Sequence, residues 1–182
     1  SDVCSSDLCR EGYLSAYDAT AKIPVYVAYT LYPQNALGCF PRTNAFVADK
    51  NAPNSATPDD YASTGYDKGH AAPDGDLSWS QQVEYESFLM TNMYPQHGSL
   101  NRGAWKLLET SVRGWAVQLN QPFTIYVGAV YTGAEKKIGS GVVVPEYYYK
   151  IVINNNTGAA AGWVFPHKAP RSEEHTSELQ SR

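Results

Sequence analysis

The hydrophobic pattern predicts strands on both sides of one amphipathic helix. Four segments are rich in Val, Ile, Tyr and Phe, whose side chains suit a pleated surface, and strands are therefore expected at residues 23–32, 121–131, 141–153 and 160–166. Residues 38–49 predict a turn and a further short strand, and residues 51–64, rich in Pro, Asn, Asp and Ser, a surface loop. The apolar run at 84–96 is expected to be buried and to stop at Pro95.

Residues 99–119 show the spacing of apolar residues that is typical of a helix. Their apolar side chains recur at spacings of three to five residues, as on one face of a helix, at Leu100, Trp105, Leu108, Val112, Trp115, Ala116 and Leu119. A single long helix between two groups of strands favours an α+β fold over a βαβ series.

A polar set follows one flank of the same helix. Glu109 and Arg113 lie eight and twelve residues after Asn101, which places the three side chains in a fan at about 100° per residue. Such a fan can serve a metal ion and a phosphate together. The alternative is a solvated helix face on which Glu109 and Arg113 form an i,i+4 salt pair.

The two ends of the chain are expected to be foreign to the domain. The DNA string AGATCGGAAGAGCACACGTCTGAA translates to RSEEHTSE, and its reverse complement, read from its second base, gives SDVCSSD, so one adapter-like sequence explains both ends. Residues 1–8 and 171–182 are therefore excluded as translated adapter. Residues 9–170 are interpreted as one domain that is truncated at both ends.

Removing these ends changes the charge balance. The basic and acidic residues fall from 14 and 18 to 12 and 13, and the net charge from −4 to −1. A balance near zero does not by itself favour nucleic-acid binding. A local basic patch is nevertheless expected from five residues around the motifs described below: Arg42, Lys68, Arg102, Lys106 and Arg113.

Two cysteines remain, Cys9 and Cys39, which either pair or stay reduced as small apolar residues. Neither belongs to a CxxC or Cys/His spacing, so no zinc site is predicted. The chain has no run of 18 apolar residues, so no transmembrane helix is expected.

Three short motifs carry a family resemblance. They are D-K-G-H at 67–70, T-N-M-Y-P-Q at 91–96 and N-R-G-A-W-K-L-L-E at 101–109. In this order and spacing they resemble the D-R-G-H, [ST]-N-x-x-P-Q and N-x-x-x-W-x-x-L-E motifs of the DNA/RNA non-specific endonucleases, the ββα-metal (His-Me finger) nucleases of the Serratia nuclease and endonuclease G type. The resemblance covers nearly all of residues 9–170.

The resemblance implies a mostly antiparallel sheet with the metal-site helix packed against it. It also implies a Mg²⁺-dependent enzyme, with Mn²⁺ as an alternative ion, that hydrolyses DNA and RNA to 5′-phosphate and 3′-hydroxyl ends. His70 would be the general base, with Gly69 allowing a close turn before it. Asn101 would be the sole direct metal ligand, and Glu109 would hold metal-bound water.

The resemblance assigns the remaining site residues less directly. Asn92 would shape the pocket, or be a plain turn asparagine. Arg42 and Arg113 would contact or brace the phosphate, although Arg42 can also be read as an exposed basic residue. Lys68 stands where the family has arginine, so the charge is kept and the two-pronged grip on phosphate is lost.

A second reading is a catalytically weak or inactive nucleic-acid-binding domain that keeps the fold, which Lys68 favours and the complete set of motif residues disfavours. Asp74 and Asp76 are interpreted as solvated loop acids, and His97 and His167 are assigned no role. Host, location in the cell and oligomeric state are left open.

Overall fold

A six-stranded antiparallel sheet forms the centre of the structure, a computed structural model that describes residues 7–167. Every neighbouring pair in it is antiparallel. The strand order is β1 (Asp7–Cys9), β2 (Leu14–Asp18), β3 (Ile23–Leu31), β6 (Phe123–Val130), β9 (Tyr147–Asn154) and β10 (Ala160–Pro166). The expected α+β class and antiparallel sheet are confirmed.

Two short ribbons and several helical segments complete the described residues. The ribbons pair β4 (Tyr66–His70) with β5 (Met93–His97), and β7 (Lys137–Ile138) with β8 (Val142–Val143). The helical segments are η1 (Asn35–Leu37), η2 (Pro58–Tyr61), α1 (Asp74–Leu77), α2 (Gln81–Ser87), η3 (Met90–Asn92), the π-helical turn η4 (Leu100–Trp105) and α3 (Lys106–Leu119). None of these helices is long and apolar enough to cross a membrane.

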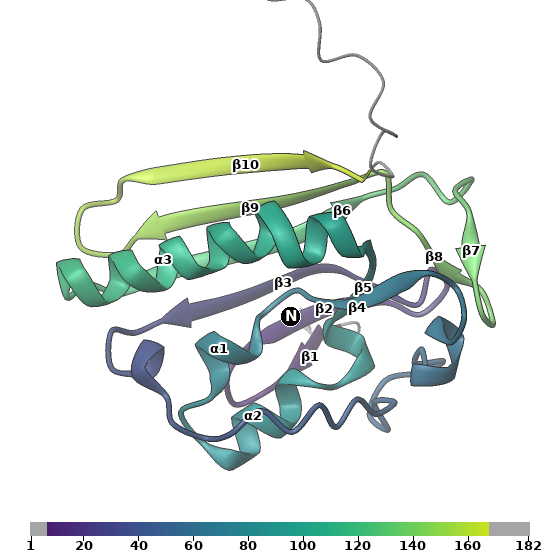
Figure 1. Ribbon diagram of the computed structural model, residues 1–182, viewed down its shortest axis with the longest axis horizontal. Coiled ribbons are helices and arrows are strands. Elements are labelled where there is room, and N and C mark those ends of the chain that lie inside the picture. Colours follow the sequence, from purple (N-terminus) through teal and green to yellow (C-terminus); the bar gives the residue numbers. More distant parts are fainter. Residues whose placement is uncertain (1–6, 168–182) are drawn as a thin grey trace, which may run out of the picture.

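Helix α3 lies along the sheet (Figure 1), where its apolar face meets the buried face of the strands. Leu108, Val112 and Ala116 are buried in the core that they share with the sheet. Trp115 and Leu119, expected on the same face, are 37% and 55% exposed, because the buried stripe is narrower than the sequence pattern suggests. Trp115 stacks on Trp163 of β10 at the margin of the helix, with ring centroids 6.1 Å apart.

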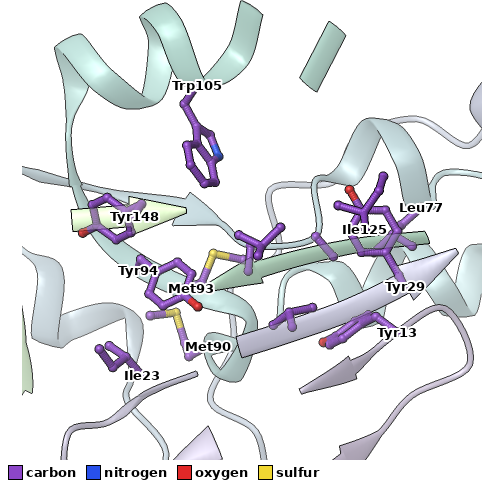
Figure 2. Close-up of a cluster of buried hydrophobic side chains, with 14 of the residues drawn as sticks. Tyr13, Ile23, Tyr29, Leu77, Met90, Met93, Tyr94, Trp105, Ile125 and Tyr148 are labelled. Carbon is purple, nitrogen blue, oxygen red and sulfur yellow. The ribbon is translucent and has the colours of Figure 1, made fainter. Parts of the chain in front are cut away.

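Aromatic side chains join the β4–β5 ribbon to the large sheet. Figure 2 shows Tyr94 of β5, Tyr148 of β9 and Trp105 at the end of η4 in one cluster. The Tyr94 and Tyr148 ring centroids are 5.4 Å apart, and those of Trp105 and Tyr148 are 6.1 Å apart. All three side chains are fully buried, so this cluster fixes the ribbon and the start of α3 relative to the sheet.

Several boundaries differ from the sequence prediction. Residues 38–49 contain no strand, only an isolated bridge from Val47 to Leu89. The run 84–96 divides among α2, η3 and β5, and Pro95 lies inside β5 rather than ending it. Proline is tolerated there because β5 pairs with β4 alone among the described strands.

A proline also divides the strand predicted at 141–153. Pro145 lies between β8 and β9, since it cannot donate a ladder hydrogen bond. Strands β1, β2 and β4 and helices α1 and α2 were not predicted. Their segments are short and mix polar with apolar residues, so their apolar residues show no clear helical or strand periodicity.

The N-terminal segment and the cysteines can be placed in part. Asp7 and Leu8, excluded above as translated adapter, pair with β2 as part of β1. The rest of both excluded ends lies outside the described residues. Cys9 and Cys39 are exposed free thiols, so the disulfide alternative is not adopted.

Candidate functional site: a cationic cleft at the ββα finger

The site is built on the elements β4, β5 and α3, which lie in this order along the chain. Strands β4 and β5 pair antiparallel, with His70 opposite Met93, and the chain then enters α3 through the π-helical turn η4. His70 ends β4, Asn101 lies in η4, and Glu109 and Arg113 lie on α3. Backbone irregularities of the π type are frequent at functional sites. Here the turn lets Asn101 face the same cleft as the residues of α3.

Gly69 has a packing role in this ribbon rather than the turn role expected for it. It lies inside β4, and a Cβ there would meet Oε1 of Gln96 at 2.0 Å. Gln96 is completely buried on β5. The glycine therefore lets the side chain of the facing strand approach the backbone next to His70.

A cleft of about 380 Å³ lies between β4, η4, α3, the start of α1 and the segment around Arg42. It is lined by Arg42, Lys68, His70, Pro73, Asp74, Gly75, Asn101, Arg102, Lys106, Glu109 and Arg113. Every predicted site residue except Asn92 is in this lining. The five cations of the expected basic patch are all present, against two carboxylates, so the cleft has an excess of positive charge in a protein whose net charge is −4.

Burial keeps His70 neutral. Its ring packs against Phe46 and Phe88, with centroids 5.7 and 5.1 Å away. Its Nε2 is buried and hydrogen-bonds to no described residue. Burial, helped by the nearby positive charge of Arg42, lowers the pKa of His70 to about 3. At neutral pH the imidazole is therefore in the form that can accept a proton.

The low pKa of His70 predicts loss of stability in mild acid. The folded-state pKa of about 3 lies below the unfolded value near 6.5, so the unfolded chain binds the additional proton. Stability is then complete above about pH 6.5 and declines as the pH falls towards 3. Between pH 7.5 and 5, His70 alone should cost about 2 kcal/mol of unfolding free energy.

Guanidinium chloride unfolding of wild type and His70→Asn at the two pH values measures this cost. The difference in unfolding free energy between the two proteins should change by that amount, while His167, whose pKa burial lowers to about 4, affects both proteins equally. Parallel pH dependences would show that His70 is not held neutral.

Asn101 is oriented by a carboxylate. Its Nδ2 donates to Oδ2 of Asp67 at 3.0 Å, and Arg102 donates to both oxygens of the same carboxylate at 2.8 Å. With its amide nitrogen bound to Asp67, Asn101 can present its amide oxygen as a ligand. The aspartate of the D-K-G-H motif thus contacts the loop that supplies the expected metal ligand.

The carboxylate of Glu109 forms an ion pair with the buried Lys150. Its Oε1 lies 3.6 Å from Nζ of Lys150, which is 1% exposed and lies 4.7 Å from the centre of the Trp105 ring. Burial raises the pKa of Glu109, and the charge of Lys150 opposes the rise. The i,i+4 pair considered for Glu109 and Arg113 does not form, because Arg113 donates to Asp76 instead.

Lys68 faces the cleft, whereas Asn92 does not. Lys68 lines the cleft, with Nζ 4.9 Å from the centre of the Phe46 ring. Asn92 is completely buried and does not line it. The Asn92 amide exchanges hydrogen bonds of 2.9 and 2.8 Å with the backbone of Ala72 and donates to the carbonyl of Ser87. Asn92 therefore braces the segment after His70 from inside the protein and does not face the cleft.

The interpretation of Asp74 and Asp76 as solvated loop acids is wrong. They are 8% and 2% exposed, and they pair with Arg42 and Arg113 respectively. Their closeness in sequence to His70, four and six residues away, could have suggested a place near the site. The sequence pattern did not predict the helical turn α1 that carries them.

His97 and His167 lie together outside the cleft, with ring centroids 4.6 Å apart. The backbone N–H of His97 donates to Nε2 of His167 at 2.8 Å. Their contact ties the end of β5 to the residue that follows β10.

Comparison with known proteins agrees with the motifs. The model of the family described as DNA/RNA non-specific endonuclease matches residues 1–181. "Nuclease 1, mitochondrial" of Schizosaccharomyces pombe is 30% identical over 87% of this chain and 56% of its own length. A nuclease of Nostoc sp. is 32% identical over 80% of this chain and 53% of its own, and human mitochondrial endonuclease G is 28% identical over 82% and 54%.

A solved structure shares the fold. The crystal structure of an EndoG/EndoGI complex aligns with a TM-score of 0.72 at 24% identity, over 89% of this chain and 74% of that one. The chain spans about half the length of the curated relatives it matches.

Proposed function

Because this chain belongs to the DNA/RNA non-specific endonuclease family, we propose that it hydrolyses phosphodiester bonds in both DNA and RNA. The observation that carries the proposal is one cleft in which His70, Asn101 and Glu109 meet five cationic side chains. Hydrolysis needs an activated water, positive charge that neutralises the phosphate oxygens and a stabilised leaving group. The residues of the cleft can supply the first two of these themselves.

The cations of the cleft bind the substrate backbone. Contacts to phosphate carry no base information, so such a cleft supports cleavage with little sequence preference. Among them Arg113 presents a guanidinium that can meet two phosphate oxygens at once. Lys68 supplies a single ammonium where the family has the two-pronged group, which predicts weaker transition-state binding rather than an inactive site.

The donor set of the cleft fits Mg²⁺, with Mn²⁺ as an alternative. Asn101 offers an amide oxygen and Glu109 a carboxylate, and hard oxygen ligands suit these ions. Among residues 7–167 no group of three His, Cys, Asp or Glu side chains could hold a metal ion. A site with so few protein ligands leaves most positions to water, as Mg²⁺ prefers. When bound, the ion would supply charge for the phosphate and the leaving oxygen.

His70 acts as the general base in this proposal. Its neutral imidazole takes a proton from the attacking water, which adds to phosphorus as the bond to the 3′ oxygen breaks, and the departing oxygen takes a proton from solvent water. The products are a 5′-phosphate and a 3′-hydroxyl. A phosphate bound near Arg42 also offsets the charge that helps to keep the pKa of His70 low, so substrate binding strengthens the base.

The complete chain incubated with supercoiled plasmid and with RNA, in Mg²⁺, Mn²⁺ or EDTA, tests the proposal. Both substrates should be cut with either metal and neither in EDTA. Product ends should accept a 5′ label only after phosphatase treatment, since they already carry a 5′-phosphate.

Two outcomes would contradict it. Cleavage that persists in EDTA excludes the metal. A folded protein that binds nucleic acid without cutting it favours the inactive binding domain, and Lys68→Arg would then show whether this substitution explains the lost activity.

A further inference from the structure

We propose that the Asp-Gly-Asp segment (residues 74–76) at the start of α1 positions Arg113 for the cleft and, through Asp74, lowers the affinity of the cleft for phosphate. Its two aspartates have different effects: Asp76 supports catalysis by fixing Arg113 in place, and Asp74 opposes the incoming phosphate. The inference rests on the proposed function in one respect, that the cleft binds phosphate.

Asp76 is a rigid anchor for Arg113. Its Oδ1 accepts from Nη1 of Arg113 at 2.5 Å, and its Oδ2 accepts from the hydroxyl of Tyr29 at 2.7 Å. Because both carboxylate oxygens are occupied and the side chain is 1% exposed, the group cannot turn away. Arg113, with 23% of its side chain exposed, keeps part of its guanidinium available to the cleft.

Gly75 supplies the surface against which the same guanidinium rests. A Cβ added to Gly75 would lie 3.0 Å from both Cζ and Nη1 of Arg113. That separation is tighter than an ordinary carbon contact of about 3.5–4.0 Å. The backbone at Gly75 and the carboxylate of Asp76 therefore fix the Arg113 side chain from two sides.

Asp74 holds its arginine loosely. One oxygen lies 3.3 Å from Nη1 of Arg42, and the other, Oδ1, is buried with no hydrogen-bond partner among residues 7–167. Arg42 does not depend on this contact, because its Nε donates to Asn44 at 2.8 Å and its guanidinium lies 4.9 Å from the centre of the Phe88 ring.

The main effect of Asp74 is thus its charge. It places a buried carboxylate in the lining of a cleft that must receive phosphate. Removing that charge while keeping the shape should strengthen binding, whereas loosening Arg113 should weaken catalysis.

Four variants of the complete chain test this: Asp74→Asn, Asp76→Asn, Gly75→Ala and, as a matched control, Asp59→Asn, whose side chain is exposed and outside the cleft. Binding of a labelled single-stranded oligonucleotide is measured in EDTA by fluorescence anisotropy, kcat and KM in Mg²⁺, and Tm for each protein.

Asp74→Asn should bind the oligonucleotide about fivefold more tightly, since one repulsive charge is gone. Asp76→Asn should lower kcat about 10²-fold, the scale of a misplaced catalytic contact. Gly75→Ala should lower kcat about tenfold with little change in Tm, because alanine favours the helix and Gly75 has no positive φ. Asp59→Asn should match wild type.

Binding by Asp74→Asn that equals or falls below wild type would overturn the role of Asp74. If Asp76→Asn and Gly75→Ala both kept the wild-type kcat, and Asp76→Asn had a lower Tm, the segment would stabilise the fold without positioning Arg113 for catalysis. If Asp76→Asn does not fold, Gly75→Ala decides alone. Loss of cleavage in every protein, wild type included, with tighter binding by Asp74→Asn would reject the proposed function and keep the inference on Asp74.

Discussion

Replacing His70 by alanine is expected to lower kcat by about 10²–10⁴-fold, the usual contribution of a general base. KM should change little, because the cations that hold the substrate remain. The fold should also persist, since Nε2 of His70 makes no hydrogen bond to a described residue. Steady-state cleavage of plasmid DNA and of RNA, with Tm as the measure of folding, checks all three expectations.

The pH profile distinguishes a base from a binding group. The acid limb of kcat/KM reports the free protein, in which the pKa of His70 is lowered to about 3 by burial and by Arg42. We therefore expect kcat/KM to show no His70 titration between pH 5 and 8. His97→Ala, a histidine outside the cleft, is the matched control and should keep wild-type rates. A His70→Ala protein that retains a tenth or more of the activity would require another base.

Lys150→Met is expected to produce the largest loss of stability. The substitution leaves the buried Glu109 carboxylate without its partner, and breaking a buried pair from one side costs about 3–5 kcal/mol. Activity should fall as well, because the pKa of Glu109, already raised by burial, rises further once the positive charge is gone. Urea unfolding and cleavage rates measure the two effects, with the exposed Lys50→Met as control.

A double variant separates stability from function. Lys150→Met with Glu109→Gln buries no charge, so at least half of the lost unfolding free energy should return, as neutral replacement of buried pairs often allows. Activity should remain lost, since the carboxylate is still absent. A double variant as unstable as Lys150→Met would show that Lys150 acts through packing on Trp105 rather than through the ion pair.

The sequence revealed the long helix and four strands of the large sheet, β3, β6, β9 and β10. Ala160–Pro166 was predicted with its observed bounds, and the segments of β3 and β6 were found because β-branched and aromatic residues dominate them. Short elements were missed. The strand that ends in His70 contains Asp, Lys and Gly, so its pairing with β5 comes from tertiary contact rather than from propensity.

The candidate residues were also available from the sequence, because the spacing of the three motifs is a local property of the chain. His70, Lys68, Asn101 and Glu109 could be named in this way. Arg113 was named from the polar flank of the helix and Arg42 from the family resemblance, and the structure places all six in one cleft. Asn92 was named with them, but the direction of its side chain could not be known. It points into the protein, where backbone groups of the segment after His70 satisfy it.

The sequence by itself determined the class of fold, the family and the side chains that bear the chemistry, since these depend on residue type and local spacing. Only the tertiary structure decided how those side chains are paired. Lys150 reaches Glu109 from a strand 41 residues later, and Asp76 reaches Arg113 from 37 residues earlier. Whether an aspartate is solvated or buried against an arginine depends on which segments meet when the sheet and α3 pack. The local spacing of residues does not predict this.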